Sequence, residues 1–326
     1  MRILFWGTPD FAVPPLRALH GEGFDVVGVV TQPDRPRGRS RSQLDPSPVK
    51  QVAVEEGVPV LQPERPRGDA FLDELRTLAP DLSVVVAYGH ILPKAVIDLP
   101  RLGTLNIHAS VLPLLRGADP IRAALLQGFA TTGVSIMRMV PALDAGPVLH
   151  VLETPIPDDE TYGELWSRLS ELGAQALVEA LALLESGAAG EVPQDEAQAT
   201  YAPKTQREDA RLDWTRPAED VARAVRAYDP RPGAFGVLRG AEVKLFGARP
   251  VLVEERPDVT PGEVIALGTD GVVVKCGEDA VRVTHVQPAG RPRLEAAAWV
   301  NGRGVELGDV FTGTAAMPHA ERGGDA

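Results

Sequence analysis

Short apolar segments alternate with segments of helical periodicity through residues 1–190, and this alternation limits the possible fold more than any other feature. Strands joined by helical crossovers pair in parallel, and helices then cover both faces of the sheet. We therefore predict a mainly parallel α/β sheet. The expected strands are RILFWG, FDVVGVVT, LSVVVAYG, GTLNIH and TTGVSIMRM, and the expected helices cover residues 14–22, 48–57, 70–79, 120–128 and 160–187.

The turn after the first expected strand is GTPDF, which differs from the glycine-rich turn of dinucleotide-binding sheets. Those sheets need glycines where the backbone meets a pyrophosphate, and Thr8, Pro9 and Asp10 do not supply them. We therefore predict a Rossmann-like sheet that does not bind NAD.

The chain of 326 residues is long enough for two domains, since a domain takes roughly 150 residues. Large apolar residues become scarce near residue 190, and a helix followed by short strands with Gly and Pro turns comes next. Such strands predict a small β-barrel that resembles an OB-fold. The expected parts are a first domain at 1–189, a linker at 190–208, a C-terminal β-barrel domain at 209–311 and a disordered tail at 312–326.

Basic residues concentrate in one segment of this acidic protein. The net charge is −12, which disfavours indiscriminate binding to nucleic acid. Residues 34–50, here called the basic loop, are rich in Pro, Gly and Ser. On charge alone, a solvated loop and a nucleic-acid contact are equally good interpretations. The basic residues of the loop are Arg35, Arg37, Arg39, Arg41 and Lys50, against the acidic residues Asp34 and Asp45.

Composition excludes several other classes of protein. The one cysteine, Cys276, cannot form an internal disulfide and lies in an apolar run, so we expect a buried thiol. The six His are scattered, and no metal is expected. No run of 18 apolar residues predicts a membrane span, and the first residues lack a signal-peptide pattern, so a cytoplasmic protein is expected.

Three polar residues form the main candidate site. Asn106 and His108 lie two residues apart at the end of an apolar strand, and Asp144 follows in the segment ALDAG. Alone, each would be an ordinary strand-end or surface residue. Together, an amide, an imidazole and a carboxylate suit acyl or formyl transfer between amines, which forms an oxyanion and moves protons. Ligands of open α/β sheets bind at this end of the strands.

Several motifs resemble those of the folate-dependent formyltransferases, over residues 1 to about 311. They are ILFWGTPDFAVPPL, QPDRPRGRSR with SPVK, VVVAYGHILP, NIHASVLPLLRG, TTGVSIMRM with LDAG, YAPK and DPRPGAF. In this family Asn106, His108 and Asp144 match the catalytic triad. The resemblance implies 10-formyltetrahydrofolate as the formyl donor, and the α-amino group of methionine on initiator tRNA as the acceptor.

The resemblance also assigns binding residues. It places Ser110, Val111, Leu112 and Pro113 in a folate-binding stretch, and Ala87, Tyr88, Gly89, Ile91 and Leu92 around the pteridine ring. The basic loop matches a segment that reaches the acceptor arm of tRNA, and the second domain matches a barrel that contacts the tRNA body. The implied tRNA-binding residues are Arg35, Arg37, Arg39, Arg41, Lys50, Lys204 and Arg231.

Two alternatives remain open. A formyltransferase that acts on a nucleotide-linked amino sugar would share the triad, but those relatives lack the SPVK loop in this form. A non-catalytic nucleic-acid-binding protein could use the basic loop and the barrel, although the triad and the acidic balance disfavour it. Under the main hypothesis, a formyltransferase acting on methionyl initiator tRNA, a monomer is expected.

Overall fold

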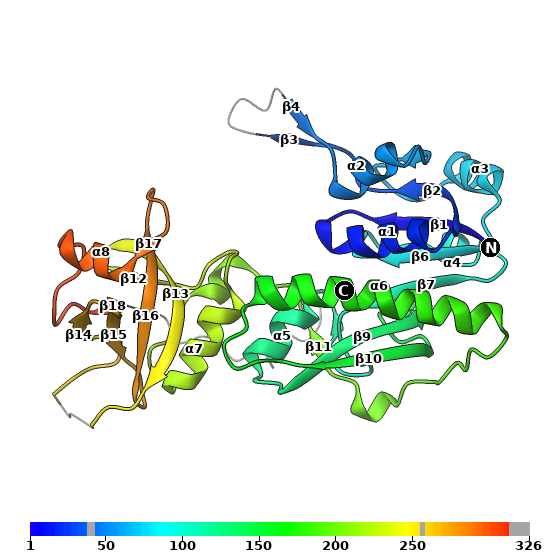
Figure 1. Cartoon of the computed structure of the whole chain (residues 1–326). Coiled ribbons are helices and arrows are strands. Elements are labelled where there is room, and N and C mark those ends of the chain that lie inside the picture. The colour runs from blue at the N-terminus through cyan, green and yellow to red at the C-terminus, as the bar shows by residue number, and fades with distance from the viewer. Residues whose placement is uncertain (38–42, 255–257, 313–326) are drawn as a thin grey trace. The chain divides into compact units, whose positions relative to one another are not determined.

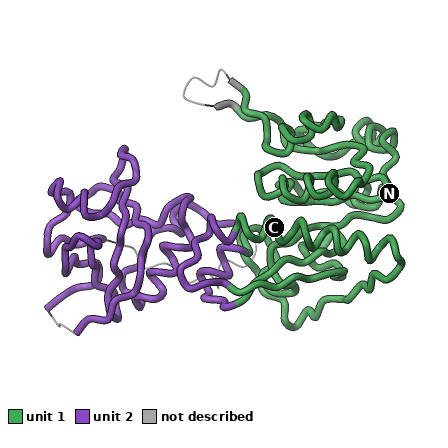
Figure 2. The backbone as a smooth tube through the Cα atoms, viewed as in Figure 1, with its two compact units in different colours: residues 1–120, 131–155, 166–203 green, residues 121–130, 156–165, 204–326 purple. Residues whose placement is uncertain are grey.

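The computed structural model describes residues 1–37, 43–254 and 258–312. The chain forms two compact units, which Figure 2 shows in different colours. Unit 1 contains residues 1–120, 131–155 and 166–203, and unit 2 contains residues 121–130, 156–165 and those from 204 onward. Arg39, Arg41 and residues 313–326 of the expected tail lie outside the described residues.

Unit 1 is built on seven strands: β1 (Arg2–Gly7), β2 (Asp25–Val30), β5 (Val60–Leu61), β6 (Leu82–Val86), β7 (Thr104–His108), β9 (Thr131–Arg138) and β10 (Val148–Pro155). Their order in the sheet is β10-β9-β7-β6-β1-β2-β5 (Figure 1). Neighbours from β7 to β5 are parallel, whereas β9 is antiparallel to both of its neighbours, β7 and β10. The predicted mainly parallel sheet is confirmed.

Helices cover both faces of this sheet. Leu4 and Trp6 of β1 pack with residues of α3 and α4 on one face. On the other face, Gly173 of α6 lies so close to Ile107 of β7 that an added Cβ would be 3.1 Å from its side chain. The helices are α1 (Val13–Gly21), α2 (Pro48–Glu55), α3 (Asp69–Leu78), α4 (Lys94–Ile97) and α6 (Tyr162–Glu185), with a 3-10 turn η1 (Asp10–Ala12) before α1.

Local sequence explains where the shorter helices begin and end. α2 begins after Ser47, whose hydroxyl accepts a hydrogen bond from the Lys50 amide at 3.0 Å, and Pro48 occupies the first helical position. α3 ends at Leu78 because the next residue, Ala79, has a left-handed φ of 44° and Pro80 follows it. These boundaries turn the chain back into the next strand of the sheet.

The segment expected as a linker is bonded to unit 1 over most of its length. β11 (Tyr201–Ala202) pairs in parallel with β8 (Arg116–Gly117), and Val192 bridges Val148 of β10. A 3-10 turn, η2 (Glu196–Gln198), lies between these contacts. The segment before residue 204 is therefore part of the folded unit that contains the triad.

Unit 2 contains a curled antiparallel sheet. Its strands are β12 (Phe235–Leu238), β13 (Ala241–Val251), β14 (Val264–Gly268), β15 (Gly271–Lys275), β16 (Ala280–Pro288), β17 (Leu294–Glu295) and β18 (Phe311–Thr312). Their order is β14-β15-β16-β13-β12-β18, with β17 paired to β16. A bridge between Glu263 and Val310 joins the two ends of the sheet, so the predicted barrel-like curvature is confirmed.

A single apolar core fills the inside of this curled sheet. Trp214, Phe235 and Phe311 are at most 3% exposed and pack with α7 and α8. The helices of unit 2 are α7 (Ala218–Ala227) and α8 (Ala296–Asn301), with the 3-10 turn η3 (Arg207–Ala210), and most of α5 (Pro120–Leu126) also belongs to this unit. The predicted helix before the strands is thus confirmed as α7.

Burial of Cys276 gives a direct test of the core of unit 2. The side chain is fully buried, and burial raises the pKa of its thiol to about 12. Because the thiolate is the reactive form, we expect the native protein to react with a disulfide reagent at pH 8 at least about 100-fold more slowly than the unfolded chain. The measurement is the labelling rate with and without guanidinium chloride. Immediate labelling of the native protein would contradict the buried core.

Candidate active site

Asn106 and His108 project from the same face of β7. In the register with β6, Asn106 lies beside Val85, which packs on the face covered by α3 and α4. Ile107, between them, contacts α6 on the opposite face. The predicted period of two thus places the amide and the imidazole side by side at the carboxyl end of a parallel strand.

The two nitrogens of His108 have different neighbours. Nε2 lies 2.9 Å from the carbonyl oxygen of Leu115, and Nδ1 lies 3.7 Å from the carboxylate of Asp144. A carbonyl oxygen can only accept, so Nε2 carries the hydrogen in the neutral ring. Nδ1, which faces the carboxylate, is therefore the nitrogen that can take up or donate a proton during a reaction.

Asp144 is held in an unusual backbone conformation. Its φ is +48°, a region that Asp adopts more readily than most residues, and its carboxylate accepts a hydrogen bond from the Gly117 amide at 2.8 Å. An added Cβ at Gly146 would lie 1.9 Å from the Arg138 carbonyl oxygen. The motif LDAG therefore needs its glycine for a close backbone approach, which fixes the turn that carries the carboxylate.

The amide of Asn106 is available to a substrate. Its side chain is partly exposed. No group within the described residues hydrogen-bonds this amide, whereas the nearby polar side chains Ser110 and Ser135 are both buried and bonded to the protein. The site thus combines an open amide, one free imidazole nitrogen and a carboxylate.

The expected folate-binding stretch follows β7 directly. The Ser110 hydroxyl donates to the Leu114 carbonyl oxygen at 2.6 Å, so the loop itself uses this group. Leu112 donates its amide to Ser135 at 3.1 Å and packs its buried side chain against Met137. Val111 and Pro113 are partly exposed. Hydrogen bonds within the protein therefore fix the backbone of this stretch, and most of its side chains are apolar.

The expected pteridine-binding segment follows β6, the neighbour of β7. Leu92 and Tyr88 are buried, and Tyr88 contacts Trp6 edge to face. Burial raises the pKa of Tyr88 to about 12, and its hydroxyl is without a partner among the described residues. Ala87, Gly89 and Ile91 are exposed. Since β6 and β7 are parallel neighbours, both of these expected segments leave the sheet at the edge where Asn106 lies.

The described part of the basic loop begins and ends in hydrogen bonds. β3 (Arg35–Arg37) pairs with β4 (Gln43–Asp45), and the Arg35 guanidinium bonds to the Gln32 side chain. Gln32 in turn donates to the Tyr88 carbonyl oxygen at 3.0 Å. A polar contact thus connects the start of the basic loop to the expected pteridine segment.

Lys50 at the end of the loop is paired. Its ammonium lies 2.6 Å from the carboxylate of Asp34, and both side chains are less than one-quarter exposed. The hydrogen bond from Lys50 is the main cause that lowers the pKa of Asp34, and a bond from Gln62 adds to it. In unit 2, Lys204 and Arg231 are exposed. Lys50 is thus partly buried in an ion pair, whereas Lys204 and Arg231 face solvent.

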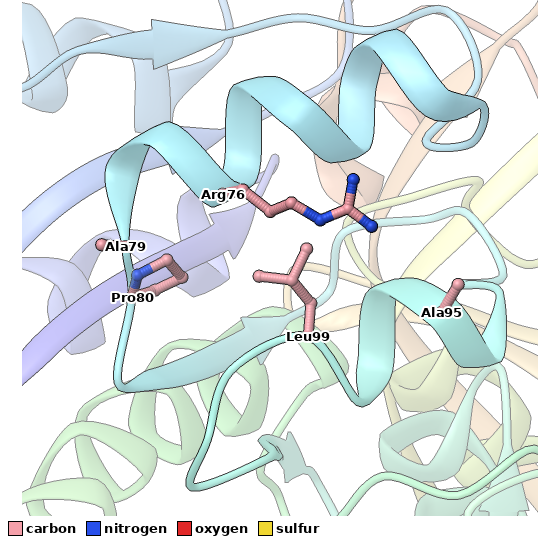
Figure 3. A pocket seen from close by; sticks show the side chains of 5 residues that line it. All are labelled: Arg76, Ala79, Pro80, Ala95 and Leu99. Atoms are coloured by element: carbon pink, nitrogen blue, oxygen red, sulfur yellow. The ribbon is translucent and has the colours of Figure 1, made fainter.

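A separate surface pocket lies away from these residues. Figure 3 shows this pocket of about 290 Å³, lined by Arg76, Ala79, Pro80, Ala95 and Leu99. Pro80 precedes β6 and Leu99 precedes β7, so the pocket lies at the amino edge of the strands. The candidate residues lie at the carboxyl edge, and none of them lines the pocket.

Two further absences concern the described part of the chain. Residues 1–37, 43–254 and 258–312 contain no group of three or more His, Cys, Asp or Glu that could hold a metal ion. None of the helices in these ranges combines the length and apolar character needed to cross a bilayer.

The sequence did not reveal that residues 192–202 contact the site. Gln194 bonds to the Asp144 and Gly146 carbonyl oxygens, at 2.8 and 2.7 Å, and Glu196 bonds to Arg116. These polar residues lie in a segment without periodicity that was expected to be a linker. The partner residues are about fifty to eighty positions away, so no local pattern could identify the contact.

Comparison with known proteins agrees with the geometry. Residues 1–181 match the formyl transferase family, and residues 204–304 match the formyl transferase C-terminal domain. A methionyl-tRNA formyltransferase of Methylococcus capsulatus is 47% identical over 306 residues, which are 94% of this chain and 98% of the relative. The enzyme of that name from Bacillus licheniformis is 45% identical over 308 residues, 94% of this chain and 96% of the relative.

A solved structure extends the comparison. HypX from Aquifex aeolicus in complex with tetrahydrofolic acid is 25% identical, with a TM-score of 0.61 over 96% of this chain. The match covers 50% of HypX, so the chain spans about half the length of that protein. With family matches in both units and close relatives over nearly its whole length, the chain belongs to the formyl transferase family.

Proposed function

We propose that this chain transfers a formyl group from 10-formyltetrahydrofolate to the α-amino group of methionyl initiator tRNA, for translation initiation. The observation that carries this proposal is the identity of about 45% to methionyl-tRNA formyltransferases over 94% of the chain, which includes the C-terminal domain. Members of the family act on different formyl acceptors. We therefore infer the acceptor from relatives that match the chain over both domains.

Asn106, His108 and Asp144 supply the groups that formyl transfer needs. The new bond joins the acceptor nitrogen to the formyl carbon, and the bond to the donor nitrogen breaks. The acceptor amine releases a proton, and the leaving nitrogen gains one. We assign removal of the amine proton to Asp144. The pair formed by His108 and Asp144 then delivers a proton to the leaving nitrogen. The Asn106 amide donates to the oxyanion of the tetrahedral species.

The bond between His108 Nε2 and Leu115 limits how the imidazole can act. Since Nε2 already donates to a carbonyl oxygen at 2.9 Å, only Nδ1 can donate to the oxyanion. Its separation of 3.7 Å from Asp144 is longer than a hydrogen bond, so Nδ1 is not saturated by the carboxylate. We therefore propose that Nδ1 of the protonated ring donates to the oxyanion while Asp144 keeps the ring oriented.

The segments at the carboxyl edge suit a folate. Residues 87–92 and 110–113 present exposed backbone and apolar atoms, while the polar Ser110 hydroxyl is occupied. A flat heterocycle needs such an apolar slot with a few backbone donors and acceptors. We propose that these two segments bind the pteridine, with the Tyr88 ring supporting the slot from the core.

The basic loop and unit 2 would contact tRNA. We propose phosphate contacts for Arg35, Arg37, Arg39, Arg41, Lys204 and Arg231. The pair of Lys50 with Asp34 suggests that Lys50 mainly anchors the end of the loop. The proposed organisation is a catalytic domain at 1–189 and a tRNA-binding domain at 209–311, joined by residues 190–208, most of which fold with unit 1. The enzyme would act as a monomer in the cytoplasm.

The acceptor can be tested by following a labelled formyl group. We expect label from 10-formyltetrahydrofolate to appear on methionyl initiator tRNA and not on a UDP-linked amino sugar offered in parallel. Acid-precipitable counts on the tRNA and chromatography of the sugar measure the two products. Label on the sugar alone would contradict the proposed acceptor, and label on neither would contradict the proposed enzyme activity.

Substitution of the triad should remove catalysis and keep the fold. We expect Asn106→Ala and Asp144→Asn each to lower kcat by about 100-fold or more, because each removes a donor or a proton acceptor from the reacting atoms. Single-turnover transfer measures the effect. Thermal unfolding checks the fold, and the exposed Asp73→Asn serves as the matched control. Wild-type turnover in either variant would remove that residue from the mechanism.

Arg35 should contribute to tRNA binding by charge. We expect Arg35→Ala to weaken binding of tRNA without changing kcat, and to reduce the slope of log Kd against log salt by about 1. Filter binding at several salt concentrations measures the slope. Arg76→Ala is the control, since Arg76 lies at the pocket on the opposite edge (Figure 3). An unchanged slope in Arg35→Ala would exclude a phosphate contact.

A further inference from the structure

Residues 192–202, here called the connector segment, lie against the loop that follows β7. The Thr200 carbonyl oxygen accepts the Arg116 amide at 2.8 Å, and the Thr200 hydroxyl accepts the Leu115 amide at 2.9 Å. The Ala202 carbonyl oxygen accepts the Ala118 amide at 2.9 Å. An added Cβ at Gly117 would lie 2.7 Å from this same oxygen. The connector segment and the loop are thus joined by backbone hydrogen bonds and packed closely together.

Arg116 links the connector segment to both ionisable groups of the site, His108 and Asp144. Its side chain is 1% exposed, and its guanidinium forms two parallel hydrogen bonds to Glu196, at 2.9 and 2.8 Å. The residue before Arg116 receives the bond from His108, and the residue after it donates to Asp144 at 2.8 Å. An anchored Arg116 therefore fixes the peptide groups that orient the imidazole and the carboxylate.

Gln194 completes a ring of hydrogen bonds. Its Oε1 accepts from Arg116 Nε at 3.0 Å, and its Nε2 donates to the Asp144 and Gly146 carbonyl oxygens at 2.8 and 2.7 Å. The acceptor role of Oε1 settles the orientation of the amide, because guanidinium nitrogens only donate. Gln194 thus bonds to both ends of the turn that holds Asp144 at its left-handed φ of 48°.

We propose that Gln194 is a positioning residue for formyl transfer. It holds the Asp144 turn against the Arg116 loop, so that the Asp144 carboxylate stays directed at His108. This inference rests on the proposed function, since it assigns the catalytic proton transfer to that pair. A displacement of about 1 Å at such a pair can reduce turnover about 100-fold without weakening substrate binding.

A carboxylate at this position separates positioning from stabilisation of the fold. In Gln194→Glu the side chain keeps its length and can still accept from Arg116, but an ionised carboxylate cannot donate to two carbonyl oxygens. If Gln194 served only to anchor Arg116, this variant would behave as the wild type. If Gln194 positions Asp144, kcat should fall while the anchor of Arg116 remains.

The experiment compares Gln194→Ala and Gln194→Glu with a control in the same segment. Gln198→Ala is suitable because the exposed Gln198 bonds only to Asp195, at 2.8 Å, among the contacts of the described residues. We expect kcat to fall about 10- to 100-fold in both Gln194 variants, with KM for methionyl-tRNA and for the folate within about twofold of wild type. Gln198→Ala should keep wild-type kinetics, and thermal unfolding should show that Gln194→Glu is fully folded at the assay temperature.

A second readout does not depend on the acceptor. In protein with ¹⁵N-labelled histidine, the ring nitrogen resonances of His108 should shift in both Gln194 variants and stay unchanged in Gln198→Ala. Failure of the wild type to formylate methionyl-tRNA would overturn the proposed function, and the resonances would still test the contact. Wild-type kcat in Gln194→Glu, or unchanged His108 resonances in that variant, would overturn the positioning role.

Discussion

The buried guanidinium of Arg116 is the contact on which the arrangement of the candidate site depends. It is 1% exposed and is satisfied by the Glu196 carboxylate and the Gln194 amide. Burying this charge without such partners would cost free energy, so the loop and the connector segment must fold together. The backbone on either side of Arg116 then contacts His108 and Asp144. The geometry of the candidate site and the folding of residues 192–202 thus depend on the same buried contact.

The parallel arrangement of β6 and β7 explains why the proposed donor site lies next to the proposed catalytic residues. Parallel neighbours end at the same edge of a sheet, and Asn106 lies beside Val85, two residues before the exposed Ala87. The expected folate segments therefore begin within a few residues of the Asn106 amide. The pocket of Figure 3 lies at the amino ends of the strands, on the edge opposite the candidate residues.

Charge is distributed locally in this acidic protein. The total of −12 disfavours general binding to polyanions, and the cations of the basic loop are concentrated in one segment. Within that segment the described residues already differ, because Lys50 is paired with Asp34 and Arg35 is exposed and bonded to a neutral amide. An ion pair at the end of the loop can anchor it, while an arginine bound to a neutral partner keeps its charge for an anionic ligand.

The sequence by itself determined the mainly parallel sheet, the barrel-like second sheet and the placement of Asn106 and His108 on one face, because periodicity and strand alternation are local properties. It did not identify the short elements β5 and α4, the strand β10, or the burial of Tyr88 within a segment expected to line a ligand site. Only the tertiary structure decided that the expected linker holds Arg116 and the Asp144 turn. These contacts join residues 48 to 80 positions apart, and such separations leave no trace in a local pattern.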